Sequence, residues 1–346
     1  MIPRVSICVP NLNHRPFLDE RFETILGQSL QDWEAFVYDG ESDDGAWQVI
    51  QDFARRDGRL RIAQGPREGS FRAWNECLRQ TKAEYVYIAT SDDTMAPDCL
   101  EKMVAALERH SDCDLAHCPL VFIDQAGAPT PEPHWPECTV FGHHNGELSR
   151  RPHLRRAPYD GLLHLTGRLV FVSITQLLIR RSLFSKIGDF PSQWGSVGDF
   201  NWEMRATMVA NTVHVPETWA SFREHPKQLT AKVDFASLEH VARWEDMIRD
   251  ALEASSTHLN PAVAAGLRGG WLDRTAVKRT YYAGLRHRRR AFDRRFYQLQ
   301  QLVRGTAPAR SEVIRRLLGR PKWPEIAPGE IKLWLESMGC KTVIRL

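Results

Sequence analysis

The sequence predicts an α/β fold built on a mostly parallel sheet flanked by helices, followed by a helical C-terminal appendage. The first observation is that short apolar strands and helical segments alternate from residue 4 to residue 110. The second is that two of the strands end in acidic clusters, at 39–45 and 91–93. Ligands of open α/β sheets bind beyond the carboxyl ends of the strands. We therefore expect the functional site at that edge.

The elements of the N-terminal half follow from two periodicities. Apolar residues at helical spacing, such as Phe17, Phe22 and Ile25, predict a helix over 16–29. Compact runs of β-branched and aromatic residues predict strands instead, and regular strand–helix alternation implies right-handed parallel crossovers. The strands are expected at 4–10, 33–38, 60–63 and 85–90, and the other helices at 46–56, 70–81 and 97–110.

The pattern changes after residue 110. We expect strands at 114–124, 169–179, 213–215 and 219–223, and helices at 182–187 and 199–210. Residues 125–160 contain six prolines and form a long excursion of the kind that often carries binding. From residue 235 the pattern is helical throughout, so we divide the chain into a domain of residues 1–234 and a C-terminal region of residues 235–346.

The composition is that of a soluble globular protein, with 42% apolar and 26% charged residues. The seven scattered cysteines favour reduced thiols, and neither a signal peptide nor a bilayer-spanning run is evident, so we expect a cytoplasmic protein. Cys113 and Cys118, with His110 and His117, leave a zinc site open as an alternative to buried strand residues, although the usual Cys-x2-Cys spacing is missing.

The C-terminal region is electrically distinct. Between Arg274 and Arg304 there are ten Lys or Arg residues and one acid, Asp293, whereas the whole chain carries only +3. A solvated helix face explains such a segment, and so does peripheral contact with an anionic membrane at the inner face of the bilayer. Because aromatic residues are interleaved with the arginines, we favour a membrane over nucleic acid, which we do not expect as a partner.

Asp92 and Asp93 follow the buried strand at 85–90 directly. Carboxylates in that position are placed to hold a divalent cation that bridges phosphate oxygens. Taken alone, such a pair is more often structural, with Asp93 as the cap of the next helix and Asp92 solvated in the loop. Whether Asp92 and Asp93 are functional therefore depends on the other motifs in the sequence.

Three segments in order resemble the opening motifs of the family 2 glycosyltransferases, which have the GT-A fold. They are Val5-Ser-Ile-Cys-Val-Pro-Asn-Leu-Asn13, Trp33-Glu-Ala-Phe-Val-Tyr-Asp-Gly-Glu-Ser-Asp-Asp-Gly45 and Glu84-Tyr-Val-Tyr-Ile-Ala-Thr-Ser-Asp-Asp93. The resemblance covers roughly residues 3 to 230. It implies an inverting, metal-dependent enzyme that moves a sugar from a nucleotide-diphosphate donor, usually a UDP-sugar, to a hydroxyl of a glycan, a lipid-linked or another acceptor.

The resemblance also implies roles for individual positions. The donor would be bound by Pro10, Asn11, Asn13, Asp39, Arg72, Asn75, Ser91 and Asp93. Asp92 and His225 would hold Mn²⁺ or Mg²⁺, and Asp199 would be the general base that takes the acceptor proton. Trp194 and Trp202, beside Asp199, are either an acceptor platform or core residues.

Three departures from the family pattern matter. Thr90 stands where the first metal-binding acid is expected, Gly198 replaces the first acid of the pair before the helix at 199–210, and Arg72 opens an atypical helix. Two alternatives remain. One is a sugar-1-phosphate nucleotidyltransferase, which would share the nucleotide-binding architecture. The other, motivated by Thr90 and Gly198, is a degenerate module that binds nucleotide sugar or glycan without turnover. The first usually needs a glycine-rich phosphate loop after the first strand, and residues 10–16 contain no glycine.

Overall fold

The structure, a computed structural model, describes residues 2–130, 149–234, 237–288, 290–321 and 326–346. Tertiary contacts divide the chain into two compact units. The N-terminal unit comprises Met1–Lys232 together with Lys341–Leu346, and the C-terminal unit comprises Val233–Cys340. The last six residues belong to the first unit, whereas the division expected near residue 234 placed them in the C-terminal region.

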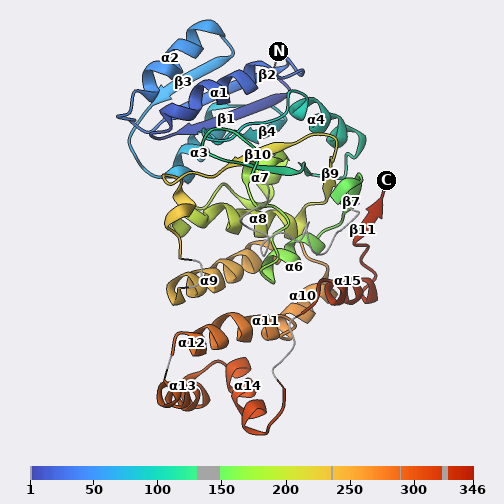
Figure 1. Cartoon of the computed structure of the whole chain (residues 1–346). Coiled ribbons are helices and arrows are strands. Elements are labelled where there is room, and N and C mark those ends of the chain that lie inside the picture. Colours follow the sequence, from blue (N-terminus) through green and yellow to red (C-terminus); the bar gives the residue numbers. More distant parts are fainter. Residues whose placement is uncertain (1, 131–148, 235–236, 289, 322–325) are drawn as a thin grey trace. The chain divides into compact units, whose positions relative to one another are not determined.

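The N-terminal unit is built on one large mixed sheet (Figure 1). Its described strands lie in the order β11-β7-β9-β5-β8-β4-β1-β2-β3. The part formed by β3, β2, β1 and β4 is parallel throughout, whereas β8 and β7 run antiparallel to their neighbours. The strands are β1 (Val5–Asn11), β2 (Trp33–Asp39), β3 (Leu60–Gln64), β4 (Tyr85–Ile88), β5 (Leu115–His117), β7 (His153–Arg155), β8 (Leu177–Arg180), β9 (Thr212–His214) and β11 (Val343–Arg345). These features confirm the predicted α/β class.

Helices cover both faces of the parallel part. Alternate residues of β1, namely Val5, Ile7 and Val9, join one core with the apolar faces of α1, α2 and α4, while Cys8 points to α3 on the other face. The helices of this unit are α1 (Arg15–Leu26), α2 (Ala46–Arg56), α3 (Ser70–Gln80), α4 (Cys99–Arg109), α6 (Tyr159–Leu165), α7 (Ser182–Ile187) and α8 (Gly198–Val209). Short 3₁₀ turns lie at η2 (Ile174–Gln176), η3 (Ser192–Val197) and η4 (Leu229–Lys232).

Strand β1 is the point where the chain reverses the direction in which the sheet grows. From β1 the sheet extends through β2 and β3 on one side, and through β4 on the other. The loops after β1 and β4 therefore diverge from adjacent strands and leave a crevice between them. The polar turn that begins at Asn11 and the segment Thr90–Asp93 both lie at this crevice, as expected from the sequence.

Two strand predictions were wrong in detail. The segment 114–124 forms two strands in different sheets, because β5 ends before Pro119, which has no N–H to donate, and β6 (Leu120–Ile123) then pairs with β10 (Ala220–Arg223). Of the segment 169–179, only the end belongs to β8. Ser173 and Gln176 form a reciprocal capping box around η2, which replaces ladder hydrogen bonds by a turn. Within the predicted excursion 125–160, residues 131–148 lie outside the described residues.

The C-terminal unit is helical in its described residues, and β11 departs from the helical pattern expected after residue 235. Its elements are α9 (Leu238–Ser255), α10 (Pro261–Arg268), α11 (Asp273–Val277), the π-helical turn η5 (Lys278–Tyr282), α12 (Ala283–Arg286), α13 (Ala291–Arg304), α14 (Ala307–Leu317) and α15 (Pro328–Ser337). Val277, Tyr281, Ala309 and Val313 form a small buried core. Among the described residues, no helix has the length and apolar content needed to cross a bilayer.

Candidate active site

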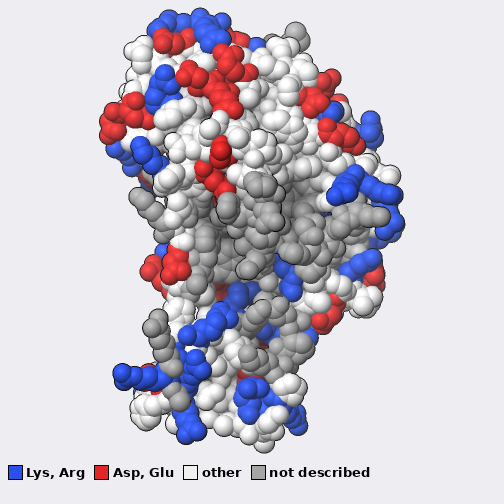
Figure 2. Space-filling view, in the orientation of Figure 1, with Lys and Arg blue, Asp and Glu red and all other residues white. Residues whose placement is uncertain are grey.

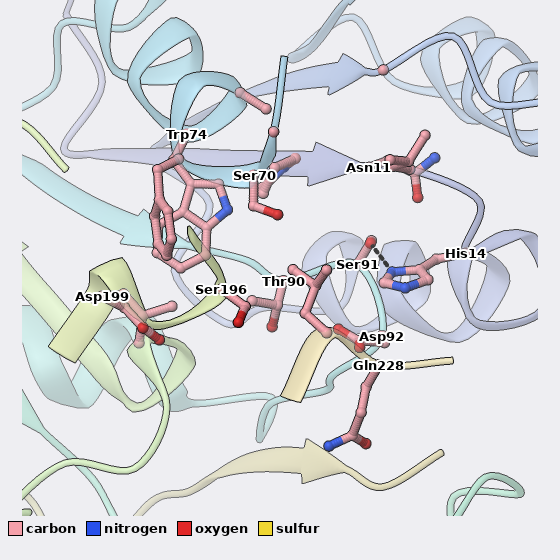
Figure 3. Close-up of a pocket in the computed structure, with 18 of the residues that line it drawn as sticks. Asn11, His14, Ser70, Trp74, Thr90, Ser91, Asp92, Ser196, Asp199 and Gln228 are labelled. Carbon is pink, nitrogen blue, oxygen red and sulfur yellow. Dashed lines mark hydrogen bonds between the residues drawn. The ribbon is translucent and has the colours of Figure 1, made fainter. Parts of the chain in front are cut away.

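A pocket of about 350 Å³ lies at the carboxyl ends of β1 and β4 (Figure 3). Its lining comes from the loops after these strands, from the start of α3, from the segment before β8, from η3 and α8, and from the chain that follows β10. Of the sequence-predicted site residues, those that line it are Pro10, Asn11, Asn13, Ser91, Asp92, Asp93 and Asp199. Residues far apart in the sequence thus meet at one cavity.

One end of the pocket is built on a hydrogen-bond network around Asp39, at the end of β2. Asp39 is fully buried and does not line the cavity. Its carboxylate accepts hydrogen bonds from Asn11 Nδ2 at 2.7 Å, from the backbone and hydroxyl of Ser42, and from Gln64 Nε2 at 2.9 Å. This network fixes the Asn11 side chain, whose Oδ1 has no hydrogen-bond partner among the described residues. Asn11 Oδ1 is therefore a buried acceptor, on a residue that lines this end of the pocket.

The other end holds a cluster of two histidines and a carboxylate. His14, in the turn after β1, lies with its Nδ1 2.7 Å from Ser91 Oγ, and His225 Nε2 lies 3.1 Å from Asp92 Oδ2. One potential ligand atom from each of His14, Asp92 and His225 lies within 4.8 Å of the others. Imidazole nitrogens and a carboxylate oxygen suit a divalent cation, so these residues fit the metal that the resemblance implies.

His14 was missed by the sequence-based reasoning, which named Asp92 and His225 alone. The sequence signal that could have identified His14 is its position directly after a polar turn at the end of a strand. The alternative zinc site has no support in the described part of the chain, where Cys113 and Cys118 do not form a metal-type cluster with His110 or His117. Both cysteines are free and buried.

Asp93 has a structural position beneath this cluster. Its Oδ1 accepts from the backbone N–H of Arg223 at 2.8 Å, and Thr90 donates its hydroxyl to the other oxygen. Burial, together with the neighbouring charge of Asp92, raises the pKa of Asp93 to about 8. Burial also pushes the pKa of Asp92 upward, but the hydrogen bond from His225 and the nearby His14 outweigh it, and the pKa of Asp92 lies below its ordinary value. The less buried acid of the pair, Asp92, is thus the one whose charged form is favoured.

Asp199 lies across the pocket from this cluster, in the first turn of α8 (Figure 3). Its Oδ1 accepts a hydrogen bond of 3.0 Å from the backbone N–H of Phe200. Burial raises the pKa of Asp199 to about 7. Glu203, one turn later, is almost fully buried, and burial and then the charge of Asp199 hold its pKa well above the ordinary value. Burial thus favours the neutral form of Glu203, and Asp199 is the carboxyl group of this helix turn that lines the pocket.

The glycine that precedes Asp199 has a steric explanation. A Cβ at Gly198 would lie 2.6 Å from the carbonyl oxygen of Pro191 and 2.8 Å from the ring of Phe71. These distances are shorter than Cβ contacts in real proteins. An acidic side chain therefore does not fit at this position, where the family pattern has one.

Six sequence-predicted residues do not line the cavity, namely Asp39 and His225, described above, and Asn75, Arg72, Trp202 and Trp194. Asn75 holds the loop before η3, because its amide donates to and accepts from the backbone of Phe190 at 2.8 and 3.0 Å. Arg72 is exposed and lies 3.4 Å from Glu68. Trp202 is fully buried and donates its indole N–H to the carbonyl of Gly188, so the structure places it in the core. Trp194 is half-buried.

Comparison with known proteins agrees with the geometry. The model of the family described as "Glycosyl transferase family 2" matches residues 6–188, which is more than half of the chain. The chain belongs to glycosyl transferase family 2. The match includes β1, β2 and β4 with the loops that line the pocket, and it ends before Asp199.

Curated relatives of this glycosyl transferase family 2 chain are bacterial. The uncharacterized glycosyltransferase EpsJ of Bacillus subtilis is 28% identical over 118 residues, which cover 34% of this chain and 34% of EpsJ. The putative glycosyltransferase EpsE of the same organism is 30% identical, over 36% of this chain and 46% of EpsE. A Campylobacter jejuni GalNAc(5)-diNAcBac-PP-undecaprenol beta-1,3-glucosyltransferase is 27% identical, over 30% of this chain and 34% of that protein. The matches thus span between a third and a half of these relatives.

Solved structures share the fold at low identity. TarS of S. aureus in complex with UDP-GlcNAc has a TM-score of 0.59 and 15% identity, and the alignment covers 90% of this chain and 81% of that one. GalNAc-T7 in complex with UDP, GalNAc and Mn²⁺ has a TM-score of 0.51 and 11% identity, over 72% of this chain and 48% of that one. The GT-A type of fold is confirmed by these similarities.

Proposed function

We propose that the chain is an inverting, metal-dependent glycosyltransferase that moves a sugar from a nucleotide-diphosphate donor, with UDP as the nucleotide, to a hydroxyl acceptor. The observation that carries the proposal is the arrangement of one pocket, with the cluster around Asp92 on one side and Asp199 on the other (Figure 3). Leaving-group stabilisation and acceptor activation are needed on opposite sides of the reacting carbon.

The nucleotide is proposed to lie at the end built on Asp39, between the loop after β1 and the start of α3. The free Oδ1 of Asn11 is an acceptor for a base or ribose N–H or O–H, and Trp74 and Phe71 line the same cavity with aromatic rings. Direct contact of Asp39 with the base, which the resemblance implies, would require the base to replace one of the four present donors. UDP in the structural neighbour TarS supports this choice of nucleotide.

The diphosphate is proposed to lie beside Asp92, His225 and Ser91. A divalent cation bound there supplies charge neutralisation for the diphosphate as the sugar leaves. Lys227 lines the same cavity and is exposed, so its ammonium is available to phosphate oxygens. The Mn²⁺ that accompanies UDP in the structural neighbour GalNAc-T7 supports a cation in this role.

Asp199 is proposed as the general base. Its ionised carboxylate takes the proton of the acceptor hydroxyl, and the hydroxyl oxygen then attacks the anomeric carbon on the face opposite the departing diphosphate, which inverts the configuration. The position in the first turn of α8 favours the charged form through the helix dipole, against the burial that disfavours it. Of the two tryptophans considered for the acceptor, only Trp194 keeps exposed surface.

The acceptor is proposed to be a lipid-linked glycan, presented at an anionic membrane to which the C-terminal unit binds. Helix α13 carries four exposed apolar side chains, Phe292, Phe296, Leu299 and Val303, whose spacing of four, three and four residues puts them on one face. Arg294, Arg295 and Arg304 of the same helix are also exposed, and Figure 2 shows Lys and Arg gathered on this unit. Apolar groups and cations on one helix are the combination that an anionic lipid surface binds. The lipid-linked substrate in the name of the Campylobacter relative supports this acceptor class.

A thermal-melting panel of nucleotides and nucleotide sugars, each with and without Mn²⁺, tests the donor proposal. A ligand that binds only the folded state at about 100 times its Kd stabilises it by about 2.7 kcal/mol. We expect a rise of several degrees with one UDP-sugar plus Mn²⁺ and a much smaller rise with either alone. Equal stabilisation with and without Mn²⁺, or none with any nucleotide sugar, would contradict the proposal.

A further inference from the structure

We propose that His14 is a third protein ligand of the divalent cation, with Asp92 and His225, and that its nitrogen gives the site a preference for Mn²⁺ over Mg²⁺. This inference rests on the proposed metal-dependent function and specifies the site. The resemblance to the family assigns no role to His14.

The separation of the His225 and Asp92 ligand atoms fits one octahedral cation. Ligands that are each about 2.1 Å from a cation and at right angles to one another are about 3.0 Å apart. His225 Nε2 and Asp92 Oδ2 are 3.1 Å apart, which is this separation. The ligand atoms of all three residues lie within 4.8 Å of one another, so small side-chain rotations close the cluster around one ion. The rings of His14 and His225 meet edge-on, with centroids 5.5 Å apart at 87°, rather than stacking.

Ser91 prepares the His14 ring for this role. The Ser91 hydroxyl lies 2.7 Å from His14 Nδ1, and when it accepts the Nδ1–H proton, the lone pair of Nε2 is left for the cation. Metal-binding histidines typically donate their second N–H to such an acceptor, which fixes the tautomer and the orientation of the ring. In Figure 3 the His14 ring lies next to Asp92, on the side of the pocket where the Ser91 contact is drawn.

His14 also compensates for a ligand that the sequence lacks. Thr90 occupies the position of the first metal-binding acid, and its hydroxyl is engaged with Asp93. Asp93 itself is buried and accepts from the backbone of Arg223, so it does not replace that acid. Of the segment Thr90–Asp93, Asp92 is thus the carboxylate that faces the cluster. Two nitrogen ligands and one oxygen ligand suit a transition-metal ion better than Mg²⁺, which prefers oxygen.

The test is pulsed electron paramagnetic resonance of Mn²⁺ bound to the full chain in the presence of UDP, which detects ¹⁴N nuclei coordinated to the ion. We expect two histidine nitrogens in the wild type and one in His14→Gln, with Mn²⁺ affinity lowered at least about tenfold. His258→Gln, at an exposed histidine of the C-terminal unit, is the matched control and should keep both nitrogens.

His14→Asp keeps the test informative if His14→Gln folds poorly, because an oxygen ligand replaces the nitrogen. We expect His14→Asp to bind Mn²⁺ with one nitrogen, and to bind Mg²⁺ at least about tenfold better relative to Mn²⁺ than the wild type does. A single nitrogen in the wild type, or two in His14→Gln, would overturn the role of His14 and leave the proposed function intact. Absence of Mn²⁺ binding by the wild type with UDP would overturn both.

Discussion

Asp199 combines two properties that oppose each other in a carboxyl group. It lines the pocket, where a base must meet the acceptor, yet it is buried enough that its pKa rises to about 7. A base is most effective when its pKa is near the working pH, because it is then both largely ionised and strongly basic. Burial holds the pKa of the neighbouring Glu203 well above its ordinary value, and this opposes a second negative charge beside Asp199. These features make Asp199 suited to proton abstraction at neutral pH.

The pH dependence of turnover follows from this residue. The ionised form of Asp199 is the active base, and its folded-state pKa is about 7, raised by burial. We therefore expect kcat/KM to fall about tenfold for each pH unit below 7 and to level off above it. Initial rates between pH 5.5 and 8.5, at saturating Mn²⁺ and with the stability of the protein verified at each pH, measure this profile. A rate that stays constant down to pH 5.5 would count against Asp199 as the base.

Single residues also show where sequence reasoning stops. The strand ends after β1 and β4 were predicted with their polar residues, so Asn11, Ser91 and Asp92 were found at the pocket. Asn75 was expected at the donor, and Trp202 either at the acceptor or in the core. Both lie on helices beside the pocket, and the side chains of both bind backbone. Which face of a helix meets a cavity depends on packing against elements distant in the sequence. For the same reason, the contact of His14 with residues more than seventy positions away was not visible.

At the level of elements, helix α13 has two faces with different partners. Tyr297 and Leu302 pack against the small core of the C-terminal unit, whereas Phe292, Phe296 and Leu299 are between 61 and 77% exposed. Tyr281 is one of the aromatic residues interleaved with the arginines of this segment, but it is 1% exposed and belongs to that core. The lipid-binding face proposed here is therefore narrower than the basic segment Arg274–Arg304.

A change on this face tests the membrane proposal. We expect the wild-type protein to float with vesicles of phosphatidylcholine that contain phosphatidylglycerol, and less so at high salt, because apolar insertion and charge attraction both contribute. Replacing Phe292 and Phe296 by serine should lower the bound fraction at least about fivefold, because each change removes a large apolar area that the vesicle would bury.

Leu333→Ser is the matched control, because Leu333 is 67% exposed on α15 of the same unit. Its flotation should equal that of the wild type. Flotation of the double variant at the wild-type level would refute α13 as the lipid-binding face, and absence of any flotation by the wild type would refute membrane binding by this unit.

Strand assignments after residue 110 were less accurate than those before it, for a physical reason. In the parallel half each strand is buried on both faces and reads as a continuous apolar run. In the mixed half, short strands such as β5 and β6 are separated by Pro119 and pair in different sheets, and apolar residues before β8 line the pocket instead of pairing. The sequence of these segments shows that they are buried, but it does not show which strands they pair with.

At the level of the whole N-terminal unit, the topology explains why the site lies where it does. The reversal of strand order at β1 opens a crevice between the loops that follow β1 and β4. Strand β10 then brings Arg223 to Asp93 and places His225 beside Asp92, and α8 delivers Asp199 from the far side. The fold class and the first strands were predictable from local patterns. The meeting of β10 and α8 with this crevice depends on contacts across more than a hundred residues, which a single sequence does not reveal.

The most direct test of this assembly is the turnover of Asp199→Asn, measured with a UDP-sugar and an acceptor, beside its donor affinity in the presence of Mn²⁺. We expect kcat to fall between about a hundredfold and ten-thousandfold, because the variant lacks a base, while the donor Kd changes less than about threefold. Above pH 7 the variant should also be more stable, by up to about 4 kcal/mol, because a buried charge with a raised pKa is removed. Asp189→Asn, at an exposed acid of the loop before η3, should leave both measurements unchanged. A folded Asp199→Asn protein with wild-type turnover would contradict the proposed mechanism.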